Sequence, residues 1–118
     1  MKLSEIKDIL DAEVICGQEF LDKEVASAFG SDMMSDVLAY AKEKSVLLTG
    51  LVNPQAIRTA LMLDMRCVVF VRAKKLTEEV VALAKESGIT VLSTKLRMFE
   101  TCGKLYQKGL KGSGEVDE

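Results

Sequence analysis

Residues 46–50 read Val-Leu-Leu-Thr-Gly, an apolar run that ends at a glycine and is followed by a helix start at Asn53-Pro54. A short apolar run bounded in this way is typical of a buried strand that leads into a helix. The same pattern recurs at 67–71 and at 89–92. Three strand–helix units in succession indicate a parallel sheet, because parallel strands need long crossovers that are usually helical. A ligand site is then expected where the carboxyl ends of the strands meet.

The segment before these units predicts one helix and two short strands. Leu3, Ile6 and Leu10 recur at helical spacing, which favours an amphipathic first helix. Residues 13–16 are interpreted as a short strand and residues 25–30 as a second one. The position of the second strand suggests the edge of the sheet or a small separate sheet.

Capping residues mark the expected starts of the later helices. Ser31 is the predicted N-cap of one helix, with Asp32 and Asp36 in its first turns. These two acids could share a cation, although a solvated first turn is the more ordinary role. Asn53 and Thr77 are expected to cap the next two helices. The last helix is predicted to bury a stripe of Phe99, Cys102 and Tyr106, widened by Met98 and Leu105.

The composition fits one globular domain. The chain has 118 residues, of which 48% are hydrophobic and 29% charged, with a net charge of -2. This balance lacks the basic surface of nucleic-acid binders, and no apolar run is long enough to span a membrane. Charge also appears too early at the amino terminus for a signal peptide. We expect a cytoplasmic protein with residues 1–110 as one domain and 111–118 as a flexible acidic tail.

The cysteines and the missing histidine narrow the chemistry. Cys16, Cys67 and Cys102 are too widely spaced for a disulfide framework and fit a reducing compartment. Each could be a small core residue or a reactive thiol. The chain has no histidine, which removes the usual nucleophile pairs and the commonest zinc ligand. Without a dinucleotide or P-loop motif, we predict no enzyme activity, no cofactor and no metal.

The candidate ligand site consists of the polar and basic residues expected at the strand ends. They are Thr49, Gly50, Asn53, Gln55, Arg72, Lys74, Ser93 and Thr94. Helix N-termini beyond the strands expose N–H groups that suit an anion, and the basic loop could meet a phosphate or an acidic partner. The alternative is structural: Gly50 ends a strand, Asn53 and Thr94 cap helices, and the loop of Arg72 and Lys74 is solvated.

Several strings of the sequence together resemble the DRTGG domain family. They are residues 3–10, 13–14, 21–25, 31–38, 47–50, 55–58 and 91–94. The resemblance runs from residue 1 to about residue 110 and is greatest to small stand-alone members, some encoded beside iron-only hydrogenase genes. It implies a three-layer α/β/α sandwich with a mainly parallel central sheet, similar to the amino-terminal domain of HPr kinase.

The resemblance also implies an accessory role. The domain sits between CBS repeats in certain regulatory pyrophosphatases and within some phosphotransacetylases, where it is thought to dimerise or to transmit a ligand signal. The motifs behind the family's name are missing: Asp-Arg should fall near Leu51-Val52, and Thr-Gly-Gly near Val71-Arg72-Ala73. Leu51 and Val52 could instead bury against a second subunit.

The residues and the resemblance together lead to two functional interpretations. The first is a non-catalytic regulatory or interaction module that forms a homodimer, with a hydrogenase-related protein as an implied partner. The alternative is a small-ligand sensor that binds an adenine nucleotide or another anion at the carboxyl ends of the strands.

Overall fold

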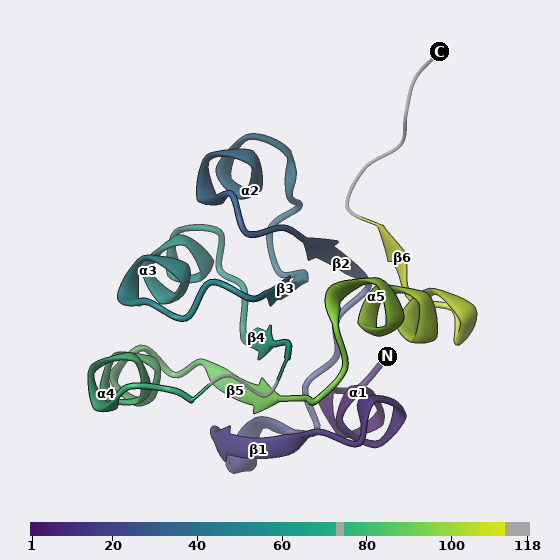
Figure 1. The fold of residues 1–118 in the computed structure, drawn as a ribbon, viewed down its shortest axis with the longest axis horizontal. Coiled ribbons are helices and arrows are strands. Elements are labelled where there is room, and N and C mark those ends of the chain that lie inside the picture. The colour runs from purple at the N-terminus through teal and green to yellow at the C-terminus, as the bar shows by residue number, and fades with distance from the viewer. Residues whose placement is uncertain (73–74, 113–118) are drawn as a thin grey trace.

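The computed structural model describes residues 1–72 and 75–112 of the chain. Within these residues, six strands form one sheet in the order β1-β5-β4-β3-β2-β6 (Figure 1). Its centre consists of β3 (Val46–Thr49), β4 (Cys67–Phe70) and β5 (Thr90–Ser93). These three strands are parallel neighbours, as the sequence predicts. Their carboxyl ends therefore lie at the same end of the sheet.

Shorter strands flank this centre. β1 (Glu13–Cys16) pairs antiparallel with β5 at one edge. β2 (Ser27–Gly30) pairs parallel with β3, and β6 (Lys111–Gly112) pairs parallel with β2 at the other edge. A 3-10 helix, η1 (Gln18–Phe20), follows β1. The second strand of the sequence is thus an inner strand, because β6 covers it.

The carboxyl-terminal segment departs from the simple tail that the sequence suggests. Lys111 and Gly112, which the sequence assigns to the tail 111–118, hydrogen-bond into the sheet as β6. A strand of two residues has too little sequence to give a period-two signal, so only its pairing reveals it. Residues 113–118 lie outside the described residues.

Helices cover both faces of the sheet and complete three layers (Figure 1). On one face lie α1 (Leu3–Leu10) and α5 (Met98–Gln107). On the other face lie α2 (Met34–Tyr40), α3 (Pro54–Met62) and α4 (Glu78–Ser87). This arrangement confirms the predicted α/β/α fold with a mainly parallel central sheet. Among the described residues, no helix has the length and apolar character that crossing a membrane requires.

The strands divide their apolar side chains between two cores. Leu47, Val68 and Phe70 pack on the face of α2, α3 and α4. Leu48 and Val69 pack on the face of α1 and α5. Because both faces are covered, these strands are apolar at successive positions and do not alternate with polar residues. Full burial of such a side chain contributes about 1.5–3 kcal/mol to stability.

The structure corrects the predicted start of α2. The sequence places Ser31 as its N-cap, but the helix begins at Met34 and Met33 is the N-cap. The N–H of Ser31 instead donates to the carbonyl oxygen of Leu48 at 3.0 Å, which continues the pairing of β2 with β3. The prediction of Ser31 as the cap, with Asp32 in the first turn, is wrong because strand pairing keeps the chain extended beyond Gly30.

Helix α5 buries only part of the stripe that the sequence predicts. Phe99 and Tyr106 are 83% and 64% exposed, so a buried stripe through these two residues is wrong. The rest of the predicted set does face the core: Leu105 is buried, and Met98 and Cys102 are partly buried against it. Thr101, which the sequence does not place in the stripe, is buried as well. Both stripes have helical spacing, so the pattern alone does not decide which one faces inward. The hydroxyl oxygen of Thr101 is buried there without a hydrogen-bond partner among the described residues, and such burial costs free energy.

Candidate functional site

Four residues with polar or charged groups meet at the carboxyl ends of β2, β3 and β4. We call them the rim cluster: Asp32, Thr49, Gly50 and Arg72. Asp32 follows β2, Thr49 ends β3 and Arg72 follows β4. These positions are far apart in sequence but close in space, because the three strands are adjacent and parallel.

The carboxylate of Asp32 is the centre of the rim cluster. Its Oδ1 accepts a hydrogen bond from the N–H of Gly50 at 2.6 Å and another from the hydroxyl of Thr49 at 3.1 Å. Thr49 Oγ1 accepts in turn from the N–H of Leu51 at 3.1 Å. A charged acceptor makes such bonds short and strong. Asp32 therefore fixes the turn that follows β3.

Arg72 supplies the cation of the rim cluster. Its φ of +69° is in the left-handed region, and its N–H donates to the carbonyl oxygen of Leu96 at 2.8 Å. Its guanidinium lies against Gly50, where an added Cβ would collide with it. Nη2 of Arg72 is 3.9 Å from Oδ2 of Asp32, and the two side chains are 44% and 54% exposed. Solvent screens a pair this exposed, so it contributes at most about 1 kcal/mol to stability.

The other predicted site residues have positions of their own. Asn53 caps α3, because its side chain accepts from the N–H of Gln55 at 2.8 Å. Thr94 is buried, and its hydroxyl donates to the last carbonyl of α1 at 2.9 Å. Gln55 itself is exposed, and Ser93 is half-buried at the end of β5. Lys74 lies outside the described residues.

Asp32 belongs to the rim cluster although the sequence does not place it among the candidate ligand residues. Its neighbour Ser31 resembles a helix cap, which puts Asp32 in a first turn. A usable signal does exist: Asp32 comes two residues after Gly30, the last residue of β2. Since β2 is parallel to β3, that strand end lies on the same side as Gly50.

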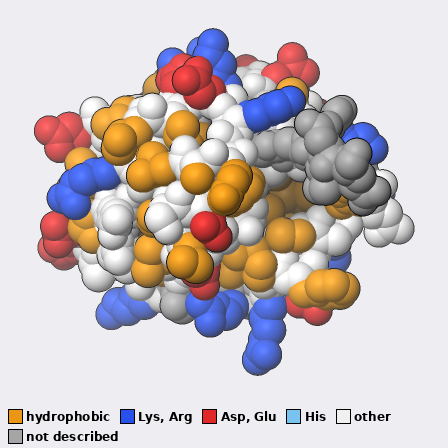
Figure 2. Space-filling model, turned by 90° about the horizontal axis from the view of Figure 1, so that it is seen from above, with side chains coloured by type: hydrophobic (Ala, Val, Ile, Leu, Met, Phe, Trp, Pro, Cys, Tyr) orange, Lys and Arg blue, Asp and Glu red, His pale blue; other side chains and the backbone are white. Residues whose placement is uncertain are grey.

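Several large apolar side chains are exposed on the helices or beside them. They are Met33, Leu38, Tyr40, Leu61, Met62, Phe99 and Tyr106. Figure 2 shows hydrophobic side chains spread over the face of the molecule on which α2 lies. Leu51 and Val52, in contrast, are half-buried and pack against the core beneath α2, α3 and α4.

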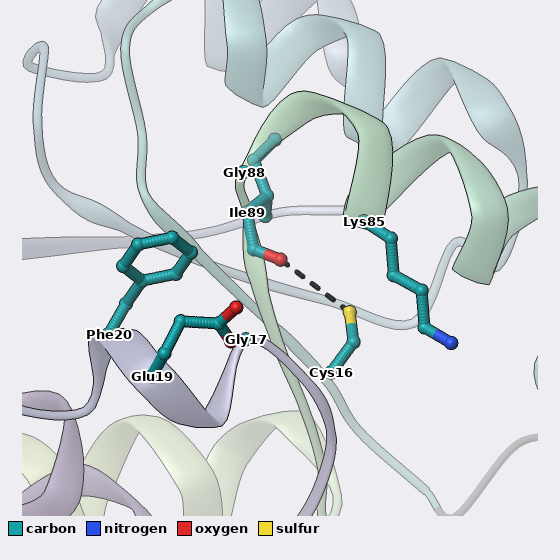
Figure 3. A pocket seen from close by; sticks show the side chains of 7 residues that line it. All are labelled: Cys16, Gly17, Glu19, Phe20, Lys85, Gly88 and Ile89. Atoms are coloured by element: carbon teal, nitrogen blue, oxygen red, sulfur yellow. Dashed lines mark hydrogen bonds between the residues drawn. The ribbon is translucent and has the colours of Figure 1, made fainter.

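A separate cavity of about 280 Å³ lies at the opposite end of the sheet (Figure 3). It is lined by Cys16, Gly17, Glu19, Phe20, Lys85, Gly88 and Ile89. The Cys16 thiol donates to the carbonyl oxygen of Ile89 at 3.5 Å, and burial raises its pKa. Burial also raises the pKa of Cys102, and that of Cys67 more strongly. No three His, Cys, Asp or Glu side chains of residues 1–72 and 75–112 form a group that could hold a metal ion.

A solved structure shows the same fold. The chain is similar to the CBS and DRTGG domains of the regulatory region of Clostridium perfringens pyrophosphatase, complexed with the activator diadenosine tetraphosphate. The TM-score is 0.71 and the sequence identity is 21%. The match covers 90% of this chain and 46% of that chain, so this chain spans about half its length.

The comparison with protein families gives the identity of the domain. Among curated proteins, none matches the chain. The family described as the DRTGG domain matches residues 5–107, which include the five longer strands and, apart from the first two residues of α1, all the helices that the structure describes. The chain therefore belongs to the DRTGG domain family.

Proposed function

We propose that this DRTGG domain is a non-catalytic regulatory module that binds a small phosphate-bearing anion at the rim cluster. The observation that carries the proposal is the position of Arg72, whose guanidinium lies against Gly50 where three strand ends meet. The same rim holds the hydroxyl of Thr49 and the N–H of Gly50, two donors that the carboxylate of Asp32 occupies in this structure. A guanidinium together with neutral donors is suited to phosphate oxygens.

The similar pyrophosphatase structure supports a regulatory role. In that structure an activator, diadenosine tetraphosphate, is in complex with a regulatory region that contains a DRTGG domain. Adenine nucleotides are therefore the first ligand class to test on this chain. The same class is named in the alternative interpretation of the sequence, a sensor that binds an adenine nucleotide or another anion at the strand ends.

The side-chain inventory supports regulation over catalysis. The chain has no histidine, so the usual general base for a serine or cysteine nucleophile is missing. The thiolate is the reactive form of cysteine. Burial raises the pKa of Cys16 and of Cys102, which keeps both thiols protonated at neutral pH.

Titration calorimetry with ADP, ATP, diadenosine tetraphosphate and pyrophosphate tests the proposal. Arg72→Ala should weaken binding at least about tenfold, because a hydrogen bond to a charged group contributes about 1.5–3 kcal/mol. Arg66→Ala is the matched control, since Arg66 pairs with Asp64 at 3.1 Å before the start of β4. The control should bind as the unaltered protein does. An unaltered protein that gives no heat and no thermal shift with the whole panel contradicts the proposal.

We further propose that the module is a homodimer that pairs through α2 and α3. These neighbouring helices expose Tyr40, Leu61 and Met62, and exposed apolar patches commonly mark interaction surfaces. Sedimentation at tens of micromolar should show a dimer, which Met62→Glu should shift toward monomer. Phe99→Glu, on the opposite face of the sheet, is the control. Only monomer in the unaltered protein would exclude the dimer. A hydrogenase-related partner stays a prediction.

A further inference from the structure

We infer that Asp32 sets the ligand class of the rim cluster. Its carboxylate already occupies the groups that a single small anion would use, so the ligand that binds must be a diphosphate or a longer phosphoanhydride. The inference rests on the proposed anion-binding function of the rim cluster. It adds a residue that decides which anions the rim accepts.

Asp32 acts as an internal anion at the rim cluster. Oδ1 takes the N–H of Gly50 at 2.6 Å and the hydroxyl of Thr49 at 3.1 Å. An N–H and a hydroxyl that converge on one oxygen are the donors that a phosphate oxygen would otherwise receive. A ligand can use them only by displacing this carboxylate.

The chain holds Asp32 close to the N–H of Gly50 and the hydroxyl of Thr49. Ser31 is paired to β3 through its N–H and Leu48, at 3.0 Å. Ser31 Oγ accepts from the N–H of Met33 at 3.0 Å, which tightens the other side of Asp32. A tethered group competes at an effective concentration in the millimolar range or above. A monocarboxylate or a single phosphate gains little by the exchange, and the displaced carboxylate repels it.

Asp32 does not hydrogen-bond the guanidinium of Arg72. The 3.9 Å between Nη2 of Arg72 and Oδ2 of Asp32 is too long for a hydrogen bond. Two linked phosphates can place one set of oxygens on Gly50 and Thr49 and another set on the guanidinium. The second contact offsets the cost of displacing the carboxylate. Inorganic pyrophosphate and nucleoside diphosphates share this chemistry.

The test is a set of calorimetric titrations with inorganic phosphate, pyrophosphate, AMP and ADP. The unaltered protein should bind pyrophosphate at least about tenfold more tightly than phosphate. Asp32→Asn removes the charge and keeps the shape, so it should tighten phosphate binding about five- to tenfold and reduce the preference for pyrophosphate. Tighter binding of ADP than of pyrophosphate would assign the source to a nucleotide; equal binding would assign it to the inorganic anion.

Asp36→Asn is the matched control. Asp36 lies in the first turn of α2, so its substitution removes the same charge near the rim without touching Thr49 or Gly50. Its affinities should stay within about twofold of the unaltered protein, because the half-buried carboxylate of Asp36 is not the one that holds Thr49 and Gly50, and salt weakens interactions between charges that are not in contact. Thermal melting of both variants shows whether they fold.

The outcomes separate the inference from the proposed function. Asp32→Asn that binds phosphate no more tightly than the unaltered protein overturns the role of Asp32, while a loss in Arg72→Ala keeps the rim as a binding site. If Asp32→Asn binds ADP more weakly and pyrophosphate unchanged, Asp32 accepts a hydrogen bond from a hydroxyl of the nucleotide. That result also overturns the inference. If Asp32→Asn does not fold, equal binding of phosphate and pyrophosphate by the unaltered protein overturns it. No binding by any form rejects the proposed function itself.

Discussion

Adding a Cβ should cost very different amounts of stability at two of the glycines. Gly88 ends α4 with a φ of +70°, and a Cβ there would meet nothing within 4 Å. Gly17 has a φ of +82°, and its Cβ would lie 2.5 Å from Cα of Thr90, a backbone atom. Gly88→Ala should therefore cost about 1 kcal/mol from strain alone. Gly17→Ala should cost about 3 kcal/mol, because crowding adds to the strain. Urea unfolding measures both, and equal losses would contradict the difference.

The thiol of Cys67 should make stability depend on pH in the alkaline range. Burial raises its pKa well above the ordinary 9.0, because the thiolate would be desolvated. The unfolded chain releases the proton near pH 9.0 and the folded chain only at higher pH. The free energy of unfolding should thus be unaffected at neutral pH and fall as pH rises past 9.0, by up to about 1.4 kcal/mol per unit.

Urea unfolding between neutral pH and pH 10 or so checks this dependence. Cys67→Ala is the reference, because tyrosines and lysines titrate in the same range and remain in both proteins. The fall should be steeper in the unaltered protein. Parallel pH profiles would show that Cys67 contributes nothing to the loss.

Residue types and strand ends were sufficient to predict part of the rim cluster. Thr49, Gly50 and Arg72 follow or end apolar runs, and the parallel pairing of β3 with β4 brings them together. The sequence does not predict Asp32 as a member of the rim cluster, because the pattern Ser31-Asp32 resembles a helix start. The physical reason lies in the tertiary structure: the hydrogen bond of Ser31 to Leu48 keeps the chain extended, and the position just after the strand end at Gly30 is the sequence signal that competes with the cap pattern.

At the scale of the element, α5 offers a direct test of which stripe faces the core. Leu105 is buried and Phe99 is exposed. Leu105→Ala should cost about 2–5 kcal/mol, because it leaves a cavity in the core of α1 and α5. Phe99→Ala should change the free energy of unfolding by no more than about 0.5 kcal/mol. Chemical unfolding of both variants gives the comparison, and a large loss in Phe99→Ala alone would restore the predicted stripe.

The elements differ in how far the sequence can predict them. β3, β4 and β5 follow from their apolar runs, because a strand buried on both faces needs no polar positions. The start of α2 and the strand β6 do not follow, since each depends on hydrogen bonds to a distant strand. The sequence does not decide which side of α5 is exposed, because two stripes of residues with helical spacing could each face the core.

At the scale of the whole molecule, the two cores should unfold together. The same strands contribute side chains to both, through alternate residues such as Leu47 and Leu48. Calorimetry should therefore show one transition, with an enthalpy of about 80 kcal/mol for a chain of this length. The van't Hoff enthalpy should agree with it. Two resolved transitions would mean that one helical layer melts separately.

The two edges of the sheet have a consequence for behaviour in concentrated solution. β1 is short and its register shifts between Val14 and Cys16, and β6 has only two residues, one of them Lys111. Edge strands that are irregular, short or contain lysine are poor templates for pairing with a strand from another molecule. Such edges should therefore disfavour growth into cross-β fibrils.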